Sequence, residues 1–323
     1  MNFPLTSLLL SALVLGCSYL FFRKNAASSC RFLGLSFTAL LLVPVLMSLP
    51  KWEVETTFSA LAQASEVSEK SSSASWLLMV WALGAGTVLV KGLRDYRALR
   101  GWLKHSHRHT AGRAELVRIS GELGLKNELE VRVCRSISGP CVMGLLRPIL
   151  LLPASSRDWS EATWRCVLLH ELSHLARRDL WFKALGQAAC VVHWFNPLVW
   201  ILHRRAQAHC EFACDAHVLK HGADAAAYAH SLCDVAAEGL QPAHALGMGS
   251  TAHLKSRVEQ LFRQPGKSSK VAMSGAFLLL LGATSVLALT RPVLPFTADE
   301  IQAPADLQEE AILRHQANPF PAE

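Results

Sequence analysis

The stretch His170-Glu171-Leu172-Ser173-His174 lies inside a predicted helix that begins after Ser160, a suitable N-cap residue. Two histidines at positions i and i+4 project from one helical face, which is the spacing needed to bind one zinc ion. Glu171 lies beside them, where its carboxylate can take a proton from zinc-bound water and pass it to a leaving amine. The motif arises by chance with odds of roughly a few per cent in a chain of this length, so alone it is a moderate signal for zinc-dependent hydrolysis.

A second predicted helix runs from Asn196–Pro197 to Gly222 and places Glu211 and Asp215 one turn apart on one face. Glu211 can complete a three-ligand zinc site, and Asp215 can accept a hydrogen bond from a ligand histidine. Taken alone, such a pair is more often an exposed acidic face. Arg177 and Asp179 predict an ion pair that supports the metal helix, although a partly exposed polar turn explains them nearly as well.

Other imidazoles and thiols compete with Glu211 for the third ligand position, and the residues alone leave that choice open. These competitors are His193, His203, His209, His217, Cys210 and Cys214. His105, His107 and His109 could form a second metal site, but a solvated basic segment next to a membrane explains them better. The nine cysteines include no CxxC pair, which predicts mostly reduced, buried thiols.

Four apolar blocks are long enough, or nearly so, to cross a bilayer as helices. They are roughly Pro4–Phe22, Phe32–Leu49, Trp76–Val90 and Val271–Thr290. The first block has no Lys or Arg before it, which favours a retained anchor over a signal peptide. The formal net charge of +7 is concentrated next to these blocks, where topology and anionic lipid explain it, so we expect no direct nucleic-acid binding.

The charges of the connecting loops predict the orientation in the membrane. The first loop carries Arg23, Lys24 and Arg31, whereas Lys51–Ser75 holds four glutamates against two lysines. By the positive-inside rule the first loop is cytoplasmic and the second is external, and the basic stretch Lys91–Lys104 keeps the following region inside. The expected division is 1–100 as a membrane region with three helices, 101–265 as a cytoplasmic zinc metallopeptidase domain, 266–290 as a fourth membrane helix and 291–323 as an external tail.

The cytoplasmic region reads as a mainly helical α+β domain. Helices are expected at Arg113–Leu123, Asp224–Glu238 and Ser250–Phe262. A small sheet is expected from Glu130–Cys134, Cys141–Met143 and Ile149–Leu152. The segment Ser138–Met143 is either an edge strand that binds substrate by strand addition, through Pro140, Val142 and Met143, or plain core.

The segment Trp181–Leu202 is nearly apolar enough to be a fifth membrane crossing. A single crossing here would place the residues before it and after it on opposite sides of the membrane, where they could not share one metal. We therefore expect this segment to be buried or to lie against the bilayer surface.

Several ordered motifs together resemble the BlaR/MecR family of membrane metallopeptidases, the gluzincin-like antirepressor receptors. The motifs are HELSHLARRD at His170–Asp179, HWFNPLVW at His193–Trp200 and EFACD at Glu211–Asp215. Two further segments are similar to the family, SGPCVMGLLRPILLLP at Ser138–Pro153 and the closing helix HLKSRVEQLF at His253–Phe262.

The resemblance implies zinc bound by His170, His174 and Glu211, with Glu171 as the general base of a metalloendopeptidase. It also implies a bacterial cytoplasmic-membrane protein whose substrate is a cytoplasmic transcriptional repressor or the chain itself. Whether the chain forms a homodimer is left open. Members that sense beta-lactams carry a large external penicillin-binding domain. The tail from Arg291 is too short to fold as one, so we expect a different sensing route.

Two alternative functions remain from the sequence. One is a membrane quality-control peptidase of the HtpX kind, which shares the HExxH and ExxxD arrangement. The other is a non-catalytic receptor or scaffold. The presence of Glu171 disfavours this alternative, because a scaffold needs no base beside a metal.

Overall fold

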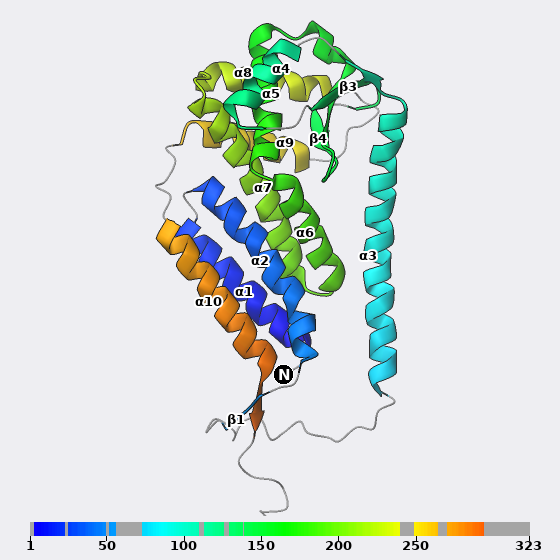
Figure 1. Cartoon of the computed structure of the whole chain (residues 1–323), viewed down its shortest axis with the longest axis vertical. Helices are drawn as coiled ribbons and strands as arrows, with labels where there is room; N and C mark the ends of the chain where they lie inside the picture. The colour runs from blue at the N-terminus through cyan, green and yellow to red at the C-terminus, as the bar shows by residue number, and fades with distance from the viewer. Residues whose placement is uncertain are drawn as a thin grey trace, which may run out of the picture.

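The computed structural model describes residues 3–22, 25–49, 52–55, 73–109, 113–125, 129–137, 139–239, 249–263 and 270–293. This part of the chain is mainly helical and contains a four-stranded sheet, so the predicted α+β class with apolar helices is confirmed. Figure 1 shows an elongated molecule, with the apolar helices at one end and the sheet with its covering helices at the other.

Within the described residues, three helices are long and apolar enough to cross a membrane. They are α1 (Phe3–Phe22), α2 (Ala26–Met47) and α3 (Ser73–Lys104). The predicted start of the second block at Phe32 is too late, because the Asn25 side chain accepts a hydrogen bond from the Ser28 amide and caps additional turns. The fourth predicted block corresponds to α10 (Lys270–Leu289), whose segment Met273–Val286 forms a shorter apolar helix.

The segment predicted as a doubtful fifth crossing forms a helical hairpin. Its two arms are α6 (Asp179–Val192) and α7 (Pro197–Lys220), joined by the turn His193–Asn196. Both arms pack against α2, and Figure 1 shows α6 and the first half of α7 beside it, with α3 on the other side. The segment is therefore largely buried and returns the chain to the end from which it came, which agrees with the expectation that it does not cross once.

Buried polar bonds fix the tip of this hairpin among the membrane helices. His193 Nε2 donates to the Leu40 carbonyl at 3.0 Å, so its Nδ1 accepts from the Ser7 hydroxyl at 2.9 Å. The Asn196 amide donates to Ser7 and Ser11 of α1, at 2.8 and 3.1 Å. Since these four side chains are fully buried, the bonds satisfy groups that would be costly to bury unpaired. His193 therefore has a structural role in the fold.

The predicted small sheet is present, with strand order β2-β3-β5-β4. The central strands β3 (Glu130–Cys134) and β5 (Ile149–Pro153) are parallel. The edge strands β2 (His107–Arg108) and β4 (Cys141–Met143) pair with them in antiparallel fashion. A separate parallel pair joins β1 (Trp52–Glu55) to β6 (Thr290–Val293).

The remaining helices include the metal-motif helix α5. They are α4 (Arg113–Glu122), a short 3-10 helix η3 (Ala154–Asp158), α5 (Glu161–Ala176), α8 (Ala225–Gly239) and α9 (Gly249–Leu261). Ser160 caps α5 as predicted, by accepting a hydrogen bond from the Thr163 amide at 3.1 Å. Leu168, Leu169 and Leu172 of α5 are buried in one core cluster with the sheet, which holds the motif helix against it.

The cysteines depart from the prediction in one respect. Seven are free thiols, but Cys30 of α2 and Cys210 of α7 form a disulfide with a Cα–Cα distance of 5.3 Å. The two residues are 180 positions apart, so no spacing rule could pair them from the sequence. Four of the seven free thiols are buried and Cys233 is exposed, which fits the expectation of mostly reduced, buried thiols.

Candidate metal centre

Side chains from α5 and α7 converge on one point. The structure brings one ligand atom each from His170, His174 and Glu211 within 4.8 Å of one another. Glu211 Oε2 lies 3.3 Å from His170 Nε2, and Glu211 Oε1 lies 3.5 Å from His174 Nε2. Two imidazole nitrogens and one carboxylate leave a fourth position open, which is the donor set of catalytic zinc sites.

A carboxylate holds the far nitrogen of each imidazole. His170 Nδ1 donates to Asp215 Oδ1 at 3.1 Å, and His174 Nδ1 donates to Asp179 Oδ2 at 3.0 Å. These bonds leave both Nε2 atoms facing Glu211, so the site fits a zinc ion on the evidence of its donor atoms. Asp215 therefore lies where the ExxxD spacing predicted.

Asp179 reaches back to His174 because the chain bends sharply between α5 and α6. Arg178 adopts a left-handed conformation with φ of 62°, unusual for a residue with a Cβ. Arg177 Nε contacts Asp179 Oδ2 at 3.2 Å, and Asp179 is fully buried. Of the two readings of this pair, the structure has the ion pair, and Asp179 also holds His174, a candidate ligand.

Two residues of this centre were missed from the sequence, Tyr228 of α8 and Arg257 of α9. The Tyr228 hydroxyl donates to Asp215 Oδ1 at 2.8 Å. Arg257 donates to the Asp215 carboxylate from Nε at 2.9 Å and from one terminal nitrogen at 2.6 Å. Its other terminal nitrogen lies 3.7 Å from Glu211 Oε2. The only available signal was the family-like segment that contains Arg257, because neither residue has a fixed spacing to the histidines.

These contacts set the charge of the centre. Burial works against the ionised form of Glu211, but hydrogen bonds with His170 and His174 lower its pKa well below the ordinary value. Burial likewise opposes ionisation of Asp215, and the bonds from Arg257 and His170 hold its pKa below the usual range. Burial disfavours protonated His170, yet its bonds to Asp215 and Glu211 raise its pKa to about 9.

We expect metal affinity to fall as the pH is lowered, because protons compete for the histidine nitrogens while Glu211 is already ionised. The pKa of His170 predicts a loss of about tenfold per pH unit for each proton displaced, between about pH 9 and pH 6. Chelator competition across this range measures the slope, and titration calorimetry in buffers of different ionisation enthalpy counts the protons released. A pH-independent affinity would contradict the assignment.

Glu171 lies next to the edge strand of the sheet. Its side chain is buried, and its position on α5 follows His170 directly. Burial and then the negative charge of Glu171 raise the pKa of Cys141 in β4 to about 12, which reflects how close the carboxylate lies to that strand. Glu171 is therefore a buried carboxylate on the helix that carries both histidines, and that helix packs against β4.

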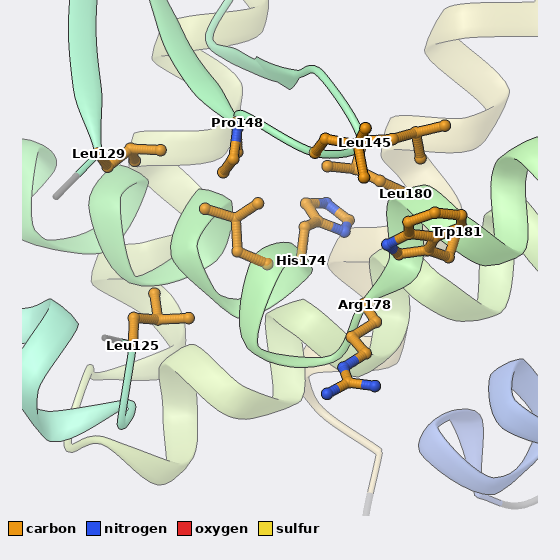
Figure 2. A pocket seen from close by; sticks show the side chains of 10 residues that line it. Leu125, Leu129, Leu145, Pro148, His174, Arg178, Leu180 and Trp181 are labelled. Atoms are coloured by element: carbon orange, nitrogen blue, oxygen red, sulfur yellow. The ribbon is translucent and has the colours of Figure 1, made fainter. Parts of the chain in front are cut away.

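A cavity of about 270 Å³ opens beside His174. Figure 2 shows His174 pointing toward Leu145, Leu180 and Trp181, with Pro148 above it and Arg178 at the margin. The full lining is Leu125, Leu129, Leu145, Leu146, Pro148, His174, Leu175, Arg178, Leu180 and Trp181. Apolar walls next to a candidate metal ligand are typical of a site that binds a substrate side chain.

The competing third ligands lie elsewhere or have other partners. His203 lies against Phe37 and Gln207, and His217 bonds to Ser173. His209 packs against Phe212, and Cys210 is in the disulfide. Cys214 comes closest, with Sγ 3.3 Å from His174 Nδ1, and it shares a second candidate metal group with His174 and Asp179. That group would need the nitrogen that Asp179 already holds.

Comparison with known proteins gives a family match. The family model described as BlaR1 peptidase M56 matches residues 36–261, more than half of the chain. The regulatory protein BlaR1 of Bacillus licheniformis is 40% identical over 84 residues, which cover 26% of this chain and 14% of that protein. The methicillin resistance mecR1 protein of Staphylococcus aureus is 26% identical over 155 residues, 47% of this chain and 26% of that protein, and that of Staphylococcus epidermidis gives the same values.

The matched segments thus span well under two thirds of these relatives. The family model nevertheless matches one continuous range of this chain, which includes α5, the α6–α7 hairpin and all of α9. The chain belongs to the BlaR1 peptidase M56 family.

Proposed function

We propose that this chain is an integral-membrane zinc endopeptidase that acts in signal transduction, by cleaving a cytoplasmic transcriptional repressor, itself, or both. The observation that carries the proposal is the convergence of His170, His174 and Glu211, with Glu171 next to them. The printed names of the relatives, a regulatory protein and resistance proteins, support the signalling part.

The protein groups have distinct roles in the proposed hydrolysis. Zinc held by His170, His174 and Glu211 would supply a Lewis acid that polarises the scissile carbonyl and the attacking water. Glu171 takes a proton from that water and returns it to the leaving nitrogen. Asp215 and Asp179 keep the two imidazoles in the tautomer that presents Nε2.

The exposed edge of β4 is the proposed binding place for an extended substrate. Residues of β4 pair with β5 on one side only in the described sheet, which leaves the other edge able to add a strand. Pro140 and Val142 are half-buried there, as a substrate contact would be. Met143, also predicted to touch substrate, is buried in a core cluster with Cys134 and Leu151, so its contribution is to hold the strand.

Replacing Glu171 by Gln tests the function in cells. We expect fragments of the substrate to appear in the cytoplasmic proteome of cells with the unaltered chain and to be absent with Glu171→Gln. One cleaved repressor identifies a signalling peptidase. Many membrane-protein fragments would indicate the quality-control alternative instead, and identical proteomes under inducing and non-inducing conditions would favour the non-catalytic scaffold.

We further propose that the metal centre faces the cytoplasm, with residues 1–100 and 266–290 in the membrane region, 101–265 inside and 291–323 outside. The charge bias of the loops supports this orientation. A reporter fused at Gly222, which ends α7 in a left-handed turn, should be active only as a cytoplasmic fusion. Activity restricted to the external compartment would overturn the orientation and exclude a cytoplasmic repressor as substrate.

A further inference from the structure

A second cavity lies between the start of α2, one face of α7 and the end of α9. Its volume is about 390 Å³. It is lined by Asn25, Ala26, Ala27, Phe212, Ala213, Asp215, Ala216, Leu219, Lys220, Gln260, Leu261 and Arg263. None of these residues except Asp215 belongs to the metal centre, so the cavity needs its own explanation.

The cavity lies at the level of the membrane surface. Asn25, Ala26 and Ala27 stand where the chain turns from α1 into α2, the two helices that can cross the membrane as neighbours. Arg263 on the other wall precedes the apolar helix α10, which begins at Lys270. Since a helix of about 20 apolar residues matches the hydrocarbon core, the ends of these helices mark the headgroup layer.

The lining is apolar inside and basic at the rim. Phe212, Ala213, Leu219 and Leu261 supply apolar wall, while Lys220 and Arg263 are exposed. Among the described residues, Arg263 has one ion pair, a 4.0 Å contact with Glu259 on its own helix, and both side chains are largely exposed, so the pair is weak.

One negative group lines the cavity, and its charge is already compensated. The Asp215 carboxylate accepts bonds from Arg257, Tyr228 and His170, which surround it from the metal side. Among the lining residues, the charges that remain at the rim are therefore the cations Lys220 and Arg263, and they favour an anion.

We propose that this cavity binds the headgroup of an anionic phospholipid of the adjoining leaflet. The phosphate lies between Lys220 and Arg263, and the glycerol and first acyl carbons contact the apolar wall. Basic pockets beside membrane helices are suited to such headgroups, whereas a free phosphate ion would leave the apolar wall unused. The inference rests on the proposed bilayer placement of α1 and α2, and it does not require peptidase activity.

The bound lipid would contact three elements that line the cavity together, α2, α7 and α9. Arg257 lies on α9 and holds Asp215 of α7, which in turn orients His170. A lipid that fixes α9 against α7 therefore stabilises the contact on which this orientation depends. We expect anionic lipid to raise the thermal stability of the purified chain and to slow its loss of zinc.

The experiment uses the full-length chain in nanodiscs of dioleoyl phosphatidylcholine that contain a small fraction of photoactivatable phosphatidylglycerol. Crosslinks should map to peptides of α7 and α9 that line the cavity. Lys220→Gln with Arg263→Gln should lower phosphatidylglycerol retention roughly 30-fold, about 2 kcal/mol for two basic residues near a phosphate. Lys220→Arg with Arg263→Lys should retain binding, and Lys255→Gln, a neutralised exposed lysine of α9 outside the cavity, is the matched control.

A second variant separates shape from charge. Ala216→Phe fills the cavity without removing a cation and should also abolish retention. Equal crosslinking of phosphatidylcholine, unchanged retention in both variants, or full displacement by inorganic phosphate at matched concentration would each overturn the proposal. Because lipid retention is measured in the Glu171→Gln background as well, failure of the peptidase proposal leaves this result interpretable.

Discussion

Glu171→Gln should leave the metal centre filled and slow peptide hydrolysis by about 10²–10⁴-fold, the range that a positioned general base contributes. Glutamine keeps the shape and burial of the side chain but cannot accept the proton of the attacking water. Glu171 is buried and directly follows His170, a ligand candidate, so it is the proposed base. Initial rates of cleavage of the identified substrate, with zinc content determined on the same samples, measure the effect.

Glu161→Gln is the matched control for this experiment, since Glu161 lies in the exposed first turn of the same helix. It should cleave at the unaltered rate. A Glu171→Gln protein that retains full activity and zinc would remove Glu171 from the mechanism, while loss of zinc in this variant would show that the residue acts on the metal centre as a whole.

Removing the ligands should have the second large effect, on metal content. The unaltered chain should hold about one zinc per molecule, and His170→Ala combined with His174→Ala should hold none after chelator treatment. Glu211→Ala should weaken zinc about as much as loss of one histidine, because Glu211 contacts both Nε2 atoms. Metal analysis of purified protein and competition with a chromophoric chelator give both quantities.

Two nearby substitutions calibrate this result. Asp215→Asn keeps the shape but removes the charge that Arg257 and His170 share, and it should cost the 10–100-fold in affinity that is typical of groups that orient ligands. His209→Ala changes a histidine two positions from Glu211 that packs against Phe212, away from the metal group, and should retain zinc. If His209→Ala strips the metal and Glu211→Ala does not, the third ligand is wrongly assigned.

The local elements were predictable because their signals are local. The Ser160 cap, the HExxH helix and the Asn196–Pro197 start of α7 each depend on residues within a few positions of one another. The three sheet segments were predicted from alternating or short apolar runs, and all three form strands. The family match of residues 36–261 extends this agreement to the order of the motifs.

The residues that contact the candidate metal ligands were harder to predict from the sequence. Asp179 was predicted to support the metal helix. Its bond to His174 requires the left-handed turn at Arg178, which cannot be predicted from the sequence. For the segment around His193, the sequence predicted only that it does not make a single membrane crossing. The hairpin itself was not predicted, because helix ends and buried polar bonds together decide whether an apolar segment crosses the membrane or turns back.

The sequence by itself determined which side chains can bind zinc from α5, because helical periodicity alone places His170 and His174 on one face. Only the tertiary structure decided which groups join them. It brought Glu211 from 41 residues away, Tyr228 from 58 and Arg257 from 87, and it paired Cys30 with Cys210 across 180 residues. The physical reason is that contacts at such separations depend on how helices pack, and packing is set by the whole buried surface, which no spacing rule within a short segment encodes.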